Sequence, residues 1–394
     1  MDSNVNASLS FIDSWQEEMI GVWQRLVNME SGSADKEGVD KIQQEIAKIL
    51  TELGVTVKIV EFPQAGATLL GELAGGAKAP VIFSGHVDTV FPLGETTMRP
   101  FKIEDGKAYG PGVLDMKGGI VALIYAIKAL RELGFCERPI KILLAGDEEP
   151  GHPHSNAVEL FTREAAGCVA AFNCETGFAD NGIVVGRKGV GYYAMEAQGI
   201  ACHFGNDPEN GRSAVRELAH KVIDIENLTN LEKGIALGVG LIAGGTVSNA
   251  GPAYARAEID LRCTNEDDLY VMIDALEKIA EKQYVEDTKT TVTGEIRFPA
   301  MKTTNGVLTL FDYLKDLSKE HGFAEPYPKF CGGGADSAYL VKAGIPTLCG
   351  MGVRGGRNHS KDEFALIESL TERSKLLTLA VLNMDRFEQT LNNQ

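Results

Sequence analysis

The sequence predicts an α/β protein with a mostly parallel sheet, helices on both faces of that sheet, and an inserted ferredoxin-like α+β domain. Three observations support this fold class. Apolar strand-like runs alternate with helical periodicity up to about residue 185, the order of elements then changes, and the alternation resumes at about residue 300. The length of 394 residues also exceeds the size at which one hydrophobic core usually stops growing, so two domains are expected.

The first part of the chain combines helices with short apolar strands. Apolar residues recur at helical spacing over 11–29 and 39–53, and Gly54 ends the second helix. The next elements are strands at 55–62, 80–84, 140–146 and 168–173, with a helix at 116–133. This alternation is typical of parallel strands that are joined by helical crossovers.

The middle part follows a different order. A strand at 182–200 is followed by a helix at 210–228, strands at 234–245 and 253–262, a helix at 265–282 and a strand at 290–298. This order is that of a ferredoxin-like domain. We therefore assign 188–298 to an inserted domain, and 1–187 with 299–394 to one discontinuous domain. The second segment of the discontinuous domain should contain helices at 305–321, 334–343 and 366–387 and a strand at 346–350.

Composition narrows the possible partners. The net charge of −17 disfavours nucleic acid and anionic membrane surfaces. No run approaches the ~20 apolar residues of a transmembrane helix, and the first 23 residues lack the basic and apolar segments of a secretory signal. The seven cysteines are scattered, odd in number and without a CxxC pair, which favours reduced thiols and a cytoplasmic protein.

Polar residues collect where the predicted strands end. His86 and Asp88 follow the run 81–83, and Glu148 and Glu149 follow the strand 140–146. Three more acidic or imidazole groups occupy similar places: Asp115 at a glycine-rich helix start, Glu175 after the strand 168–173, and His359 after the last strand. Because ligands of open α/β sheets bind at the carboxyl ends of the strands, these side chains should converge.

Such a cluster of carboxylates would repel itself unless cations balanced it. Imidazole and carboxylate groups are ligands of Zn²⁺, and two metal ions can share one bridging carboxylate. Each motif taken alone has an ordinary interpretation as a polar turn, a solvated loop or an acidic helix start. Their combination, all in loops that follow strands, predicts a site for two divalent metal ions.

Five motifs carry a resemblance to a known family: "GHVDTVFP", "YGPGVLDMKGG", "DEEPG", "GGGADSAY" and the late "HS". In this order they resemble the di-zinc amidohydrolases and peptidases that include glutamate carboxypeptidase, aminoacylase, acetylornithine deacetylase and succinyl-diaminopimelate desuccinylase. The resemblance extends from about residue 20 to residue 385 and is greatest to the glutamate carboxypeptidase branch.

The resemblance implies roles for the clustered residues. His86 and Glu175 would bind one metal, Glu149 and His359 the other, and Asp115 would bridge both. It further implies that Glu148 is the general base, that Asp88 orients His86, and that the peptide bond between Asp115 and Met116 is cis. The metals would most simply be zinc, with cobalt or manganese as alternatives.

The resemblance also implies substrate-binding residues and a homodimer that forms through the inserted lid domain. His203 would stabilise the oxyanion from the partner subunit, although the family's Ser-His-Ala-Gly motif is replaced here by Cys202, His203, Phe204 and Gly205. The residues expected to bind substrate are Arg262, Arg297, Asn249 and Gly333. A surface position for His203 and a salt bridge within the lid for either arginine are the alternatives.

Two other features remain open at this point. Asp336 and Ser337 either line the cleft or cap a helix. His152 and His154 are either extra metal ligands or outer-shell or surface residues, and the second role is expected because the ligand set is complete without them.

The function implied is hydrolysis of the amide bond of an N-acyl amino acid or peptide, which releases an amino acid with a free carboxylate. Metal-activated water would attack the carbonyl, and Glu148 would take up its proton and pass it to the leaving amine. Alternatives within the family are a deacetylase, a desuccinylase or a dipeptidase. A metal-binding protein without turnover and a structural dimerisation scaffold are the alternatives from other classes.

Overall fold

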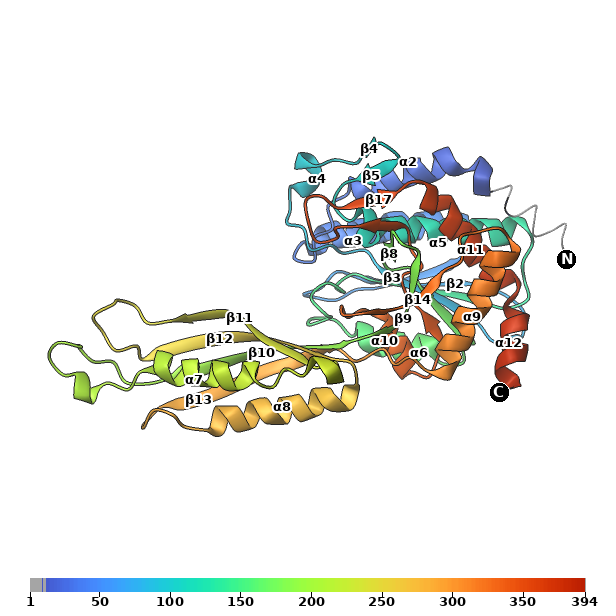
Figure 1. Cartoon of the computed structure of the whole chain (residues 1–394). Helices are drawn as coiled ribbons and strands as arrows, with labels where there is room; N and C mark the ends of the chain where they lie inside the picture. Colours follow the sequence, from blue (N-terminus) through green and yellow to red (C-terminus); the bar gives the residue numbers. More distant parts are fainter. Residues whose placement is uncertain (1–8, 10–11, 394) are drawn as a thin grey trace. The chain divides into compact units, whose positions relative to one another are not determined.

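A computed structural model of the chain describes residue 9 and residues 12–393 (Figure 1). The predicted first helix is α2, Gln16–Val27, and Phe11, where that prediction began, lies outside the described residues. The chain divides into two compact units. Unit 1 comprises 1–186, 302–330 and 335–394, and unit 2 comprises 187–301 and 331–334. The roles assigned to the two predicted domains remain predictions.

Unit 1 is built on a six-stranded sheet in the order β1-β2-β6-β3-β7-β15. The strands are β1 Thr56–Val60, β2 Thr68–Leu73, β3 Val81–His86, β6 Ile140–Ala145, β7 Ala170–Asn173 and β15 Thr347–Leu348. The pairings from β6 to β15 are parallel, whereas β1 and β2 run antiparallel to their neighbours. The predicted α/β fold with a mostly parallel central sheet is therefore confirmed, and β2 is a strand that the sequence analysis missed.

Helices cover both faces of this sheet, with α3 Lys36–Glu52 and α5 Gly118–Glu132 on one side in Figure 1 and α6 Ala157–Ala165 and α10 Ser337–Lys342 on the other. Helix α5 packs against β3 and is itself covered by α2 and α11 Glu368–Leu382, so nearly all its residues are buried. Burial on several sides explains its almost continuous apolar sequence.

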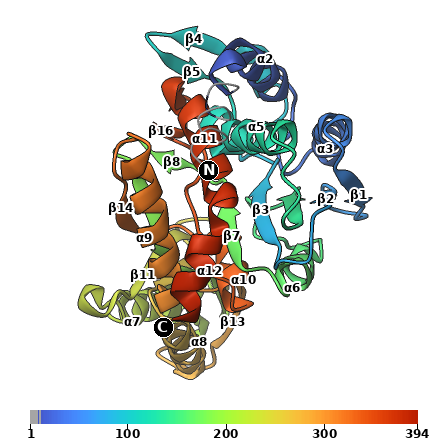
Figure 2. The same cartoon turned by 90° about the vertical axis from the view of Figure 1, so that its right-hand side faces the viewer.

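The other elements of unit 1 place the loops around the sheet. Figure 2 shows α9 Asn305–Glu320 and α12 Met384–Asn392 side by side; the predicted last helix is thus α11 and α12, which meet at Asn383. The remaining short elements are α4 Glu95–Met98, β4 Lys102–Glu104, β5 Lys107–Tyr109, β8 Gly177–Phe178, β9 Gly182–Arg187, β14 Tyr327–Cys331, β16 Arg354–Gly356 and β17 Phe364–Leu366. Strands β16 and β17 pair antiparallel, and the loop that contains His359 joins them.

Unit 2 has the predicted ferredoxin-like order of elements. These are β10 Gly189–Gln198, α7 Ala214–Glu226, β11 Ala236–Gly244, β12 Tyr254–Cys263, α8 Glu266–Glu281 and β13 Lys289–Phe298. The four strands form an antiparallel sheet in the order β11-β12-β10-β13, and both helices pack against it. The predicted strand 182–200 is in fact two strands, β9 and β10, on either side of Lys188, because β9 pairs with β14 in another sheet.

Two further features concern the helices and the cysteines. None of the helices in the described ranges has the length and apolar character needed to cross a bilayer. All seven cysteines are free thiols, and only Cys136 is exposed.

Candidate metal centre

The centre begins at the carboxyl end of β3, where a fully buried strand ends in His86. The Nδ1 atom of His86 lies 3.1 Å from the carbonyl oxygen of Asp88 and 3.3 Å from its Oδ1 atom. With Nδ1 held by Asp88, the Nε2 atom points toward the carboxylates of Asp115 and Glu175, at 3.2 and 3.1 Å. A histidine that binds metal through one nitrogen usually has its other nitrogen held in this way.

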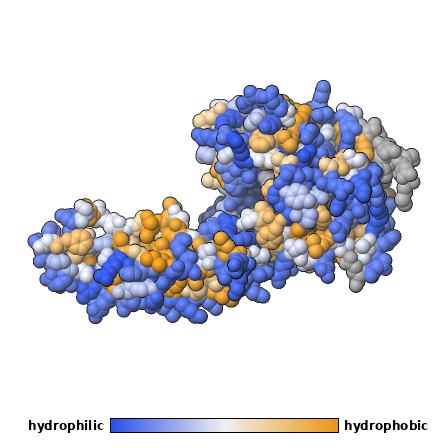
Figure 3. Space-filling model, in the orientation of Figure 1, coloured by the Kyte–Doolittle hydropathy of each residue, from blue (hydrophilic) through white to orange (hydrophobic). Residues whose placement is uncertain are grey.

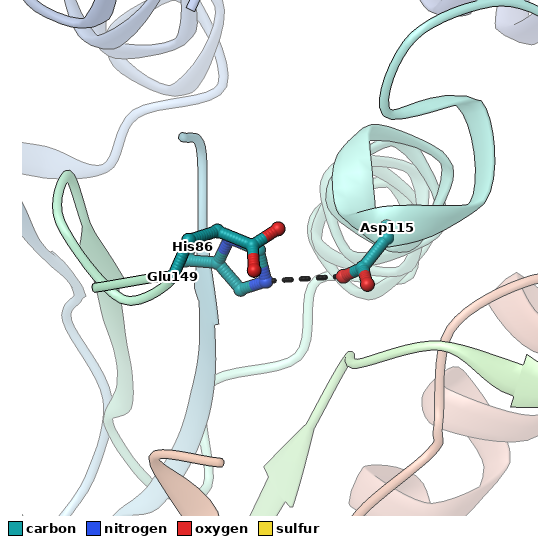
Figure 4. A group of neighbouring side chains, drawn as sticks. All are labelled: His86, Asp115 and Glu149. Carbon is teal, nitrogen blue, oxygen red and sulfur yellow. Dashed lines mark ion pairs between the residues drawn. The ribbon is translucent and has the colours of Figure 1, made fainter. Parts of the chain in front are cut away.

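Asp115 lies in the short π-helical turn Val113–Lys117 that leads into α5, and Figure 4 shows its carboxylate facing His86. The peptide bond between Asp115 and Met116 is cis, as predicted. The two oxygens of Asp115 face different imidazoles, since Oδ1 lies 3.2 Å from Nε2 of His86 and Oδ2 lies 3.2 Å from Nε2 of His359. This arrangement suits a carboxylate that bridges two cations.

Gly85 makes this approach of the loop and the strand possible. A Cβ atom at Gly85 would lie 2.2 Å from the Cε atom of Met116, so no larger residue fits there without displacement of Met116. The backbone N–H of His86 donates to the sulfur of Met116 at 3.1 Å. Packing against Met116 therefore explains the glycine before the histidine.

The loop after β6 supplies two adjacent glutamates that have different neighbours. The Oε2 atom of Glu149 lies 3.2 Å from Nε2 of His359, whereas the Oε2 atom of Glu148 lies 3.9 Å from Nε2 of His86. Asp88 holds both glutamates, because its Oδ1 and Oδ2 atoms accept their backbone N–H groups at 3.1 Å each. Asp88 therefore does more than orient His86, and Ser33 fixes it with a 2.7 Å hydrogen bond.

All five predicted ligands lie together in unit 1. Ligand atoms of His86, Asp115 and Glu149 lie within 4.8 Å of one another, as do those of His86, Glu148 and Glu175, and His359 contacts both Asp115 and Glu149. The buried Oδ1 atom of Asp115 and Oε1 atom of Glu149 have no hydrogen-bond donor. Imidazole and carboxylate donors with unsatisfied buried oxygens fit divalent cations such as Zn²⁺, whereas the individual ligand assignments remain predictions.

Burial and mutual charge perturb the titration of this cluster. Burial raises the pKa of Glu148 well above its ordinary value and that of Glu149 to about 7. Hydrogen bonds to Asp115 and Glu149 raise the pKa of His359 to about 11. Burial would raise the pKa of Asp115, but its contacts with His359 and His86 hold it below the usual range. Because metal binding to such groups releases protons, metal affinity should fall as the pH falls.

Glu363 is a residue of this region that the sequence analysis missed. Its buried carboxylate accepts backbone N–H groups from Gly112 at 3.2 Å, Leu114 at 2.8 Å and Asp115 at 2.9 Å. It thus fixes the backbone that presents the Asp115 side chain. In the sequence, Glu363 follows the exposed Asp362 in a loop, and no local signal distinguishes the two acids.

Other supporting contacts were also missed. The side-chain amide of Asn358 donates to Oδ2 of Asp115 at 3.0 Å, and its position next to His359 is the only signal that could have identified it. Asp336 precedes α10 but its side chain does not cap that helix. Instead it contacts the buried His152, whereas His154 is exposed.

The predicted substrate-binding residues belong to unit 2. Arg262 and Arg297 both place their guanidinium groups over the ring of Tyr192, at 5.6 and 5.8 Å from its centroid. Arg262 also pairs with Asp260 at 2.7 Å, and Arg297 pairs with Glu295 at 3.2 Å. Both ion pairs agree with the alternative interpretation, a salt bridge within the lid, and a role in binding substrate remains a prediction.

The remaining predicted residues of unit 2 lie in loops. His203 and Asn249 are exposed and adjacent, and the backbone N–H of Phe204 donates to the carbonyl of Asn249 at 3.1 Å. The carbonyl oxygen of Gly333 accepts a 3.1 Å hydrogen bond from Arg187.

Replacement of Glu363 by glutamine should weaken metal binding. The glutamine would place an amide donor against one of the three N–H groups, which would shift the loop of Asp115. We expect the metal affinity to fall by roughly 10- to 100-fold, as for other groups that support a metal ligand. Titration against a chromophoric chelator measures this loss, with Asp362→Asn as the matched control. An affinity within a factor of two of the unmodified chain would contradict the role given to Glu363.

Comparisons with known proteins agree with this geometry. Residues 82–383 match the model of peptidase family M20/M25/M40. Carboxypeptidase G2 of Pseudomonas sp. (strain RS-16) is 28% identical over 373 residues, which cover 94% of this chain and 90% of that protein. Succinyl-diaminopimelate desuccinylase of Rhodospirillum centenum is 28% identical over 363 residues, covering 86% of this chain and 90% of that one.

Solved structures share the fold. Aminopeptidase PepT of Bacillus cereus superposes with a TM-score of 0.76 at 22% identity, over 92% of this chain and 97% of that one. The M20 family metallo-carboxypeptidase Sso-CP2 of Sulfolobus solfataricus gives 0.73 at 18% identity, over 92% and 99%. The chain therefore belongs to peptidase family M20/M25/M40, and it is a metallopeptidase-type hydrolase that acts on peptide or amino acid substrates.

Proposed function

We propose that this hydrolase cleaves the amide bond of an N-acyl amino acid or peptide and releases the C-terminal amino acid. The observation that carries the proposal is that two adjacent glutamates, Glu148 and Glu149, have different neighbours. Glu149 contacts His359, as expected of a ligand, whereas Glu148 is buried beside the cluster and is not needed to complete the predicted ligand set. A spare carboxylate at such a centre suits a general base.

The side chains of the cluster would supply the metal ligands. His86, Asp115 and Glu175 would hold one cation, and Asp115, Glu149 and His359 the other. Zinc is the proposed metal, with cobalt or manganese as alternatives. When bound, such cations polarise a carbonyl group and lower the pKa of water to about 7.

Glu148 would move the proton. Burial raises the pKa of this carboxyl, so its carboxylate accepts a proton more readily than an exposed glutamate does. It takes a proton from the attacking water and then donates it to the nitrogen of the leaving amine. Its backbone bond to Asp88 keeps the side chain beside the ligands while this transfer takes place.

A substrate with a free carboxylate is proposed because unit 2 offers two guanidinium groups beside one aromatic ring. Arg262 and Arg297 could each exchange an internal carboxylate partner for that of a substrate. Asn249, Gly333 and His203 are proposed as further contacts, with His203 as the donor to the oxyanion. The 28% identity to carboxypeptidase G2 supports this reading.

Other activities within the family remain candidates. Relatives include a succinyl-diaminopimelate desuccinylase, and human carnosine dipeptidase 1 shares the fold with a TM-score of 0.71. A panel of N-acetyl, N-succinyl and N-aminoacyl amino acids and N-blocked dipeptides separates a deacetylase, a desuccinylase, a dipeptidase and a carboxypeptidase by the acyl group that is cleaved fastest.

A homodimer through unit 2 is also part of the proposal. Strand β11 is at the edge of its sheet, and Leu241 and Ile242 at its end are exposed, as are Val247 and Tyr254 nearby. Figure 3 shows hydrophobic side chains gathered on this part of unit 2. An apolar edge strand favours pairing with another copy of the chain. A cytoplasmic location is proposed from the free thiols.

Replacement of Glu148 by glutamine should remove turnover without removing metal. The amide keeps the shape of the side chain but cannot accept the proton, so kcat should fall by roughly 10²- to 10⁴-fold. Steady-state kinetics on the best substrate of the panel and elemental analysis measure the two quantities, and Glu159→Gln is an exposed control. Unchanged kcat in the metal-loaded variant would reject the general-base role.

A mixture of two inactive variants tests the dimer and the trans role of His203. Glu148→Gln and His203→Ala dimers are unfolded and refolded together, so that mixed dimers form. If His203 acts on the partner's centre, one centre of each mixed dimer is complete, and the mixture regains activity that neither parent has. No recovery despite mixed dimers, or a fully active monomer in analytical ultracentrifugation, would contradict this assignment.

A further inference from the structure

His152 is a buried histidine that the proposed mechanism does not use. Its side chain is 0% exposed, and both ring nitrogens face carboxylates. The Nδ1 atom lies 2.9 Å from Oδ1 of Asp147, and the Nε2 atom lies 2.6 Å from Oδ1 of Asp336. Neither partner belongs to the predicted ligand set.

These contacts require a shared proton. A neutral imidazole has one N–H donor and one acceptor, whereas an ionised carboxylate only accepts. Two hydrogen bonds therefore form only if the ring is protonated or one of the two carboxyl groups is. Burial lowers the pKa of His152, but the charges of Asp336 and Asp147 outweigh it and hold that pKa well above its usual value.

The two partners connect distant parts of unit 1. Asp147 directly precedes Glu148 and Glu149, and its Oδ1 atom also accepts the hydroxyl of Ser155 at 3.0 Å. Asp336 lies 184 residues from His152 in the chain, immediately before α10. The ring of His152 additionally packs against Phe161 and Tyr339, with centroids 6.2 and 6.1 Å apart.

The backbone of the loop folds around this contact. The N–H of His152 donates to the carbonyl of Asp147 at 3.0 Å, and the N–H of Gly151 donates to that of Glu148 at 2.6 Å. His152 has a φ of +61°, a left-handed conformation that few non-glycine residues adopt. On the other side of the loop, Asp88 accepts the N–H groups of Glu148 and Glu149.

We propose that His152 is a positioning residue: it clamps the loop that carries Glu148 and Glu149 to the start of α10 through Asp147 and Asp336. Asp88 fixes the backbone of the two glutamates. The contacts of His152 fix the residues on either side of them, Asp147 before and His152 after. The proposal rests on the proposed function, because the contacts of His152 are proposed to position Glu148, the general base.

Three substitutions separate the two halves of the clamp. In His152→Asn the amide nitrogen replaces Nδ1 and retains the bond to Asp147, whereas in His152→Gln it replaces Nε2 and retains the bond to Asp336. His152→Ala removes both bonds. His154→Ala is the matched control, since that histidine is exposed two residues further on.

The kinetic readout is the separation of kcat from KM. Misplacement of the base lowers kcat, and we expect a fall of roughly 10- to 100-fold in His152→Ala, with smaller falls in the two half-clamp variants. In the His152 variants, KM and the bound metal per chain should stay near those of the unmodified chain. In the control His154→Ala, kcat and the melting temperature should also stay near those of the unmodified chain. A kcat within a factor of two in His152→Ala, or a loss explained by lost metal, would overturn the proposal.

A second readout does not depend on turnover. Hydrogen exchange of the backbone N–H groups at positions 151 and 152 reports opening of the loop. This exchange should accelerate by about tenfold in metal-loaded His152→Ala but not in His154→Ala. Unchanged exchange would overturn the clamp even if kcat fell. If exchange accelerates but the unmodified protein turns over no substrate in the panel, the clamp stands and the proposed function fails.

Discussion

The structure depends on one electrostatic constraint, the concentration of buried carboxylates at the carboxyl ends of the parallel strands. Asp115, Glu148, Glu149 and Glu175 lie around His86 in a region with little exposure to solvent. A buried charge is costly unless it is paired, hydrogen-bonded or bound to a metal. Members of this family bind metal ions, and bound cations are the proposed balance for these carboxylates.

The surrounding chain keeps these groups in place with polar contacts as well as with the packing of Met116 against Gly85. Asp88 accepts N–H groups from the loop of Glu148, and Glu363 accepts three from the loop of Asp115. His152 joins the first of these loops to α10. Each of these three residues acts on a loop that carries a predicted ligand or base, and none of them is in the predicted ligand set.

Much of the scaffold could be predicted because it follows from local periodicity. Strand β3 begins with three apolar residues and helix α5 is apolar along most of its length, and the strand and helix order of unit 2 is evident from the alternation of its segments. The strands β2, β16 and β17 were missed, because runs of three to six residues carry little periodic signal, and glycine weakens that signal further in β2 and β16. Their pairing is set by contacts that are distant in sequence.

In the site, too, some residues could be predicted from the sequence and others could not. His86, Asp115 and His359 could be predicted to meet because each follows a strand or begins a helix in a distinctive motif. Glu363 and the partners of His152 could not, since a buried acid and an exposed neighbour such as Asp362 look alike in one sequence. Only the tertiary fold, which brings Asp336 to His152 across 184 residues, distinguishes them.

The most direct test of the account is a count of metal ions. The purified chain, stripped by a chelator and titrated with zinc, should bind two ions per chain, and Asp115→Ala should lose high-affinity binding of both because that carboxylate faces both imidazoles. A folded protein that binds no zinc with high affinity, or a folded Asp115→Ala variant that still binds two ions tightly, would contradict the central claim.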